Sequence, residues 1–96
     1  MSRRHYLVSY DIADDKRRTH VFNYLEGQGD RVQYSVFFCE LSPAERATAI
    51  AKLTEYIHHR EDQIILLDLG PATSPLHHGL HVLGLPYEPH TRTIVV

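Results

Sequence analysis

The residue best suited to do chemistry is Asp11, which directly follows the apolar and aromatic run His5–Tyr10. Such a run predicts a strand, so the Asp11 carboxylate would stand at the end of a sheet. A carboxylate is the hard oxygen ligand that Mg²⁺ requires. A single carboxylate makes a poor metal site, but two copies brought together by a dimer axis would make a better one. The alternative is that Asp11 only accepts hydrogen bonds from turn amides.

Basic residues are clustered just after Asp11. Lys16, Arg17 and Arg18 fall in the first turns of a predicted helix, where the helix N-terminus also favours anions. Arg31, at the start of a later strand, would extend this group if the fold brings it near. These four side chains predict phosphate binding. The alternative is a solvated helix face that neutralises neighbouring acidic residues.

Aromatic side chains offer a second kind of contact with nucleic acid. Tyr10, Tyr34 and Phe37 could stack on bases, although aromatic residues in strands are more often part of the core. The chain shows no Ser/His/Asp arrangement and no glycine-rich phosphate loop after its first strand. Acyl transfer and nucleotide hydrolysis are therefore not supported.

Composition limits the class of protein. A chain of 96 residues predicts one domain over residues 1–96, and its 43% hydrophobic content is that of a globular protein. The net charge of −2 argues against a protein that coats nucleic acid by charge alone. The lone Cys39 indicates a reducing compartment, and no apolar run approaches the roughly 20 residues that span a bilayer. We expect a cytoplasmic protein without a membrane partner.

The elements that must position these groups follow from turn and capping signals. Asp14 and Asp15 offer an N-cap for a helix that ends near Gly27, and residues 31–41 divide near Tyr34 into two short strands. A capping box opens a second helix, in which we expect one apolar stripe. An unbroken apolar run predicts a strand that is buried on both faces or lies inside the sheet, and a β-like run ends the chain. The capping box is Ser42–Glu45, the inner or buried strand is Ile64–Leu67, and the terminal β-like run is Thr91–Val96. The apolar stripe of the second helix consists of Ala47, Ile50, Leu53, Thr54 and Ile57.

The order of elements predicts an α+β fold, a ferredoxin-like βαββαβ arrangement with an extra C-terminal strand. Right-handed crossovers put both helices on one face of the sheet, which leaves the other face open. A homodimer that packs through its sheet faces would cover it, and the terminal strand would extend the partner's sheet edge.

Two sequence blocks resemble the CRISPR-associated Cas two family. They are Tyr10–Ile12 with the basic stretch Asp14–Arg18, and Gly29–Phe37. The blocks and their spacing cover about the first 41 residues, and the order of the elements fits over the rest. Residues 72–90 carry no recognisable part of the pattern.

The resemblance implies a ferredoxin-like homodimer that joins the Cas one integrase to capture new spacers in prokaryotic antiviral defence. Some members of the family are described as metal-dependent endonucleases that act on RNA or double-stranded DNA. On that pattern Asp11 matches the Mg²⁺-binding aspartate. The positions that match others linked to activity are Tyr10, Arg18, Arg31 and Phe37.

Two other functions stay open at this stage. One is a structural adaptor, in which the dimer spaces two integrase units and its arginines hold the DNA backbone without cleaving it. The other is a toxin-like messenger-RNA nuclease, which fits the fold but not the two blocks. This chain has His20 at a position of the first helix where some relatives carry another basic residue. A contact made by His20 would depend on pH.

Overall fold

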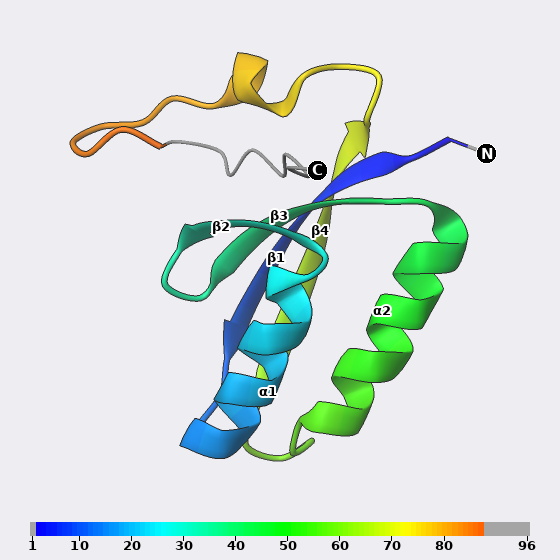
Figure 1. Cartoon of the computed structure of the whole chain (residues 1–96), viewed down its shortest axis with the longest axis vertical. Coiled ribbons are helices and arrows are strands. Elements are labelled where there is room, and N and C mark those ends of the chain that lie inside the picture. The colour runs from blue at the N-terminus through cyan, green and yellow to red at the C-terminus, as the bar shows by residue number, and fades with distance from the viewer. Residues whose placement is uncertain (1, 88–96) are drawn as a thin grey trace, which may run out of the picture.

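Strands and helices follow one another as β1, α1, β2, β3, α2 and β4 (Figure 1). The computed structural model describes residues 2–87, apart from the side chains of residues 77 and 78. The predicted order is confirmed, including the division of residues 31–41 at Tyr34, whereas the predicted strand Thr91–Val96 lies outside the described residues. The bounds are β1 Arg4–Asp11, α1 Asp15–Glu26, β2 Gly29–Gln33, β3 Val36–Leu41, α2 Pro43–Tyr56, β4 Gln63–Pro71 and a short 3₁₀ helix η1 Leu76–Gly79.

The strands form one antiparallel sheet in the order β2-β3-β1-β4. Together with the two helices this is the βαββαβ ferredoxin-like fold that the sequence predicts. The expected inner position of Ile64–Leu67 is wrong for the sheet that residues 2–87 form, because within it β4 pairs with β1 alone and lies at an edge. Burial on both faces is wrong as well, because Ile65 and Leu67 are 50% and 53% exposed and only Ile64 and Leu66 pack against the core.

Both helices lie on one face of the sheet and enclose the core (Figure 1). Because side chains alternate along a strand, every second residue of β1 and β3 points toward the helices. Neither α1 nor α2 covers the opposite face, which we call the open face, and the segment after β4 packs over one end of it at His5 and Phe38. Among the described residues, no helix is long and apolar enough to cross a membrane. The buried residues are Tyr6, Val8, Tyr10, Ile12, Val21, Leu25, Phe37, Cys39, Leu41, Ala49 and Leu53.

The capping signals place the helix starts correctly. The Asp14 side chain accepts from the Arg17 backbone N–H at 2.9 Å, and Ser42 and Glu45 form the reciprocal capping box. The predicted stripe of α2 is mostly wrong, because the helix buries Ala49 and Leu53 and leaves Ala47 exposed. Alanine and aliphatic residues of α2 occur on several sides of the helix, so the apolar pattern alone did not indicate which side faces the sheet.

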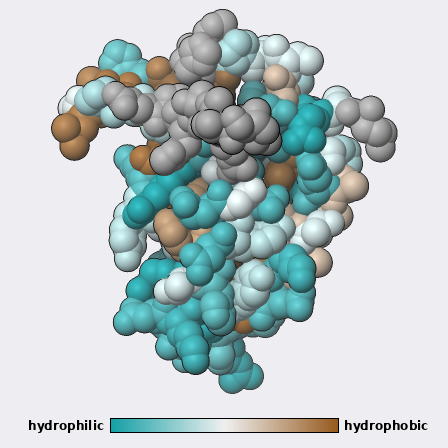
Figure 2. Space-filling view, in the orientation of Figure 1, coloured by the Kyte–Doolittle hydropathy of each residue, from teal (hydrophilic) through white to brown (hydrophobic). Residues whose placement is uncertain are grey.

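Hydrophilic side chains cover the helices, whereas apolar ones gather at the end of the molecule that carries the segment after β4 (Figure 2). Leu83 and Leu85 of that segment are 84% and 90% exposed. An apolar hollow of about 410 Å³ lies between this segment and the sheet, next to His5, Phe38 and Leu69. Most of the exposed apolar surface is therefore at this end and on β4.

Candidate functional site

A hollow of about 370 Å³ brings together three of the predicted site residues, Tyr10, Arg18 and Arg31. It lies between the first half of α1, the end of β1 and the β2–β3 turn. The three residues come from different elements. Tyr10 belongs to β1, Arg18 is the fourth residue of α1, and Arg31 belongs to β2. The remaining lining residues are Asp15, Thr19, Phe22 and Tyr34.

Tyr10 closes the inner side of this hollow. Its residue is 5% exposed, and its hydroxyl donates to the Tyr34 carbonyl at 3.4 Å. Burial raises the pKa of the Tyr10 phenol, and the nearby Arg31 charge opposes the shift only in part. The phenol therefore remains a neutral hydrogen-bond donor throughout the neutral pH range.

Phe37 lies beneath the hollow and is fully buried. Its ring stacks on Tyr10 at 6.4 Å between centroids and meets the edge of Phe22 at 5.8 Å. Both contacts are typical distances for aromatic pairs. Phe37 therefore holds two lining residues in place and does not line the hollow itself.

The two arginines of the hollow differ in how far their charge is neutralised. Arg18 Nη1 donates to Asp15 Oδ1 at 2.6 Å, and the other nitrogens donate to the Ile12 carbonyl. The hydrogen bond with Asp15 raises the pKa of Arg18. Arg31 has no carboxylate within ion-pair distance in residues 2–87 and makes only long bonds, at 3.4 and 3.3 Å, to the carbonyls of Gln33 and Tyr34. Arg31 is thus the more available cation for a phosphate.

Arg17 does not belong to this hollow, although it neighbours Arg18 in sequence. Its Nε lies 2.8 Å from Asp62 Oδ2, and its Nη2 lies 3.1 Å from Glu61 Oε1. Asp62 also accepts from the backbone N–H groups of Ala13 and His58. Arg17 therefore ties the start of α1 to the loop before β4.

Lys16, the fourth predicted phosphate ligand, is exposed and makes no ion pair within the described part of the chain. Its charge is therefore available to a ligand, as that of Arg31 is. Asp62 was not anticipated from the sequence, because its main partner Arg17 lies 45 positions away and no local motif links the two.

The Arg17–Asp62 pair predicts a specific pH dependence of stability. The Asp62 side chain is fully buried, and the hydrogen bond from Arg17 holds the pKa of this carboxyl far below its ordinary value. The charged Asp62 carboxylate stabilises the fold fully at pH values above its unfolded-state pKa of about 4. This stabilisation is lost as the pH falls below that value toward the lower folded-state pKa of Asp62. We expect Asp62→Asn to lower the free energy of unfolding by about 2–4 kcal/mol at neutral pH.

Urea denaturation from neutral pH down through pH 4 measures this effect. The gap between the wild type and Asp62→Asn should narrow as the solution becomes acidic. Glu61→Gln removes a half-exposed carboxylate from the same arginine and serves as the matched control, with a much smaller loss expected. A gap that stays constant over the whole pH series would show that Asp62 stabilises by packing and not by charge.

Asp11 stands apart from the hollow. It ends β1 opposite Gln63 and is exposed, and strand alternation places its side chain on the open face, opposite to that of Tyr10. Its carboxylate makes no hydrogen bond or ion pair with a residue in the range 2–87. The nearby amide of Ala13 is bound by Asp62 instead. The interpretation of Asp11 as a turn-bonding aspartate therefore finds no support in the described part of the chain.

The sequence matches the family model described as CRISPR associated protein Cas2 over residues 4–74. A CRISPR-associated endoribonuclease Cas2 of Geobacter sulfurreducens is 34% identical over 91 residues, which are 95% of each protein. A CRISPR-associated endoribonuclease Cas2 of Rhodospirillum rubrum is 45% identical over 67 residues, which are 70% of this chain and 66% of that protein.

Solved structures agree with these matches. The crystal structure of Streptococcus pyogenes Cas2 superimposes with a TM-score of 0.74 at 33% identity, over 83% of this chain and 99% of that one. A hypothetical protein of Thermus thermophilus, TT1823, gives a TM-score of 0.77 at 30% identity, over 92% and 99% of the two chains. With the family model covering most of the sequence, and the fold and both motif blocks in agreement, this chain belongs to the Cas2 family of CRISPR-associated proteins.

Proposed function

We propose that this protein is a Mg²⁺-dependent endonuclease that acts on RNA or double-stranded DNA in CRISPR spacer acquisition, with the Cas one integrase as its partner. Membership of the Cas2 family supports the biological setting. Relatives named endoribonuclease, and one of Thermus thermophilus named endonuclease, support phosphodiester cleavage. The observation that carries the proposal is the exposed Asp11 carboxylate, which has no partner among the described residues.

A homodimer through the open faces would complete this site. Ile65, Leu67 and Leu69 of β4 are 40–53% exposed, and such a row of apolar side chains is typical of a surface that packs against another protein. Asp11 lies on the same face at the end of the neighbouring strand. Sheet-to-sheet packing would therefore bring two Asp11 carboxylates to the dimer axis.

The donor set fits Mg²⁺ in its chemistry. Within residues 2–87 no three His, Cys, Asp or Glu side chains are grouped to hold a metal, and the proposed site takes one Asp11 carboxylate from each of two chains. This matches a cation that is bound by one or two carboxylates and otherwise by waters and phosphate oxygens. When bound, Mg²⁺ supplies a Lewis acid for the phosphodiester and lowers the pKa of a water.

The other residues have binding and positioning roles in this proposal. Arg31 and Lys16 hold backbone phosphates, because neither is neutralised by a described carboxylate. Tyr10 supplies a neutral hydroxyl at the inner side of the hollow, and Phe37 fixes its ring. Arg18 supports the hollow through Asp15, and Arg17 supports the fold.

A second candidate is the structural adaptor. The absence of a group of three metal ligands among residues 2–87 favours this role, because a site with one Asp11 carboxylate from each chain has few groups for catalysis. In this role the dimer spaces two integrase units, and its basic residues hold the DNA backbone without cleaving it.

Cleavage assays on the purified protein distinguish the two. Labelled single-stranded RNA and double-stranded DNA are incubated with Mg²⁺ or with EDTA over a pH series, and products are resolved on denaturing gels. The endonuclease predicts cleavage with Mg²⁺ that disappears in EDTA. Intact substrates under every condition, together with retained DNA binding and co-purification with the integrase, would establish the adaptor.

A further inference from the structure

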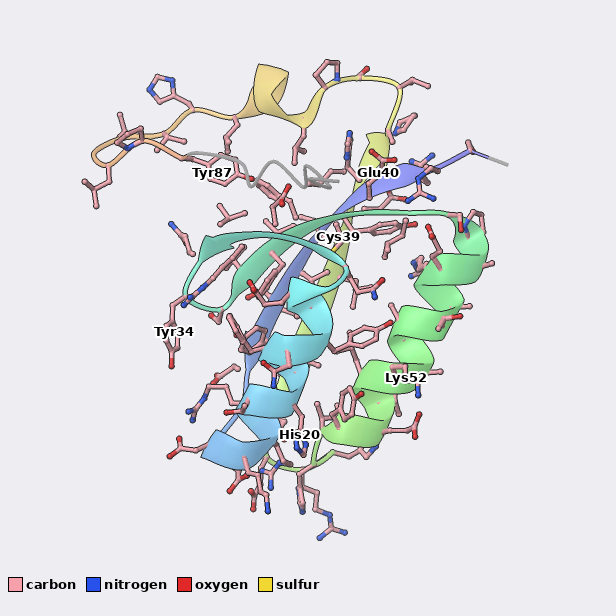
Figure 3. The ribbon with its side chains drawn as sticks, in the orientation of Figure 1. His20, Tyr34, Cys39, Glu40, Lys52 and Tyr87 are labelled. Carbon is pink, nitrogen blue, oxygen red and sulfur yellow. The ribbon has the colours of Figure 1, made fainter. Side chains whose placement is uncertain are left out.

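Tyr34 is the one aromatic residue of the described chain that is largely exposed, at 68%. It stands in the β2–β3 turn and projects away from the body of the molecule (Figure 3). Glycine, asparagine and aspartate are the residues that usually occupy such turns, so a large aromatic ring is not required by the turn. A single exposed tyrosine is common on protein surfaces, so its surroundings must carry any inference.

The surroundings of Tyr34 combine an aromatic stack with an available charge. The Arg31 guanidinium lies 5.2 Å from the Phe22 ring centroid and 5.3 Å from that of Tyr34. Arg31 therefore sits in contact range of both rings, where the cation is attracted to their faces. No described carboxylate neutralises it.

The turn that carries Tyr34 is also held in place. The Tyr34 carbonyl accepts hydrogen bonds from the Tyr10 hydroxyl and from Arg31 Nη2. The Ser35 carbonyl accepts one from the Tyr10 backbone N–H at 3.0 Å. The central strand thus anchors the turn twice. Because the backbone of the turn is held, a ligand that stacks on Tyr34 has only the side chain left to order.

We propose that Tyr34 is a base-stacking residue that binds an unpaired nucleobase while Arg31 holds the adjoining phosphate. This inference rests on the proposed nucleic-acid substrate and names a specificity-determining contact for it. Aromatic side chains stack on any base, and a neighbouring arginine adds phosphate contact and cation–π attraction. Both residues line the hollow of about 370 Å³, which is within the size range of small-ligand pockets.

The contact selects single strands over duplexes. In a duplex both faces of an internal base are covered by its neighbours, whereas an unpaired base can turn a face to an aromatic ring. Tyr34 therefore adds affinity for single-stranded RNA or for frayed ends and adds none for a fully paired helix. Arg31 contributes to both, because phosphates are present in both.

A tryptophan reporter tests the stacking directly. The chain contains no tryptophan, so Tyr34→Trp places the only one at the proposed contact. In EDTA, where a metal-dependent nuclease leaves the strand intact, a short single-stranded RNA should quench its fluorescence. An abasic strand of equal length, with the same phosphates but no bases, should not. Equal responses to both strands, or no response to either, would overturn the inference.

Binding affinities provide the second measurement. By fluorescence anisotropy in EDTA, Tyr34→Ala should bind the single-stranded RNA about tenfold more weakly, a loss of about 1.4 kcal/mol, because the stacking contact is removed. Tyr34→Phe should retain binding, and duplex binding should be unchanged in both variants. Leu85→Ala, an exposed apolar truncation elsewhere, is the control for loss of surface area. A parallel loss on single strand and duplex would contradict a stacking role.

These outcomes separate the inference from the proposed function. Quenching by the RNA in a protein that never cleaves would leave the Tyr34 contact standing and would remove the nuclease. Mg²⁺-dependent cleavage without base-dependent quenching would leave the nuclease standing and would remove the contact.

Discussion

Asp11→Asn is expected to reduce Mg²⁺-dependent cleavage by about 100-fold or more. Asparagine keeps the size and polarity of the side chain but removes the negative charge that a hard divalent cation requires. Metal polarisation of a phosphoryl oxygen stabilises a transition state by several kcal/mol, and each 1.36 kcal/mol corresponds to a factor of ten in rate. The fold should be unaffected, because Asp11 is exposed and has no polar partner among residues 2–87.

Two readouts make this prediction specific to the metal site. The cleavage rate is measured on the RNA and DNA substrates, and Mn²⁺ binding is followed by electron paramagnetic resonance with no substrate present. Both should fall in Asp11→Asn. Asp68→Asn is the matched control, since it removes a half-exposed carboxylate that pairs with Arg4 toward the other end of the sheet. Cleavage and Mn²⁺ binding that survive in Asp11→Asn would exclude the paired carboxylates as the metal site.

Phe37→Ala should produce the largest loss of stability of the variants considered, about 3–5 kcal/mol in the free energy of unfolding. The Phe37 side chain is fully buried and touches Tyr10 and Phe22, so truncation leaves a cavity between the sheet and α1. Domains of this kind are stable by roughly 5–15 kcal/mol in total. Urea denaturation followed by circular dichroism measures the loss.

The neighbouring residue provides the control for this truncation. Phe38 is partly buried on the open face, and its ring meets Tyr87 edge-on at 6.2 Å. Phe38→Ala removes the same atoms from a less enclosed position and should cost clearly less. Equal losses in the two variants would show that the helix-covered side is not the main core. Phe37→Leu should stay folded, and a reduced cleavage rate in that variant would identify Phe37 as a positioning residue for Tyr10.

The helix starts, the division of residues 31–41 and the order of elements could all be predicted from the sequence. Asp14 and the Ser42–Glu45 capping box satisfy backbone groups within three residues of themselves, so their effect does not depend on the rest of the chain. The motif blocks likewise indicated the family, because they are short and local. The resemblance singled out Tyr10, Arg18 and Arg31 one by one, and only the structure shows that these three residues line one hollow.

The long-range relations required the tertiary structure. Strand pairing put β4 at an edge of the sheet that residues 2–87 form, although its apolar run is typical of an inner strand, because β1 is the one described strand that pairs with it. The alternation of β1 separated Asp11 from Tyr10 onto opposite faces, although they are adjacent in sequence. Arg17 pairs with Asp62, which lies 45 positions away, whereas no carboxylate among residues 2–87 lies within ion-pair distance of Arg31. Such contacts depend on which segments the chain brings together, and no local pattern encodes that.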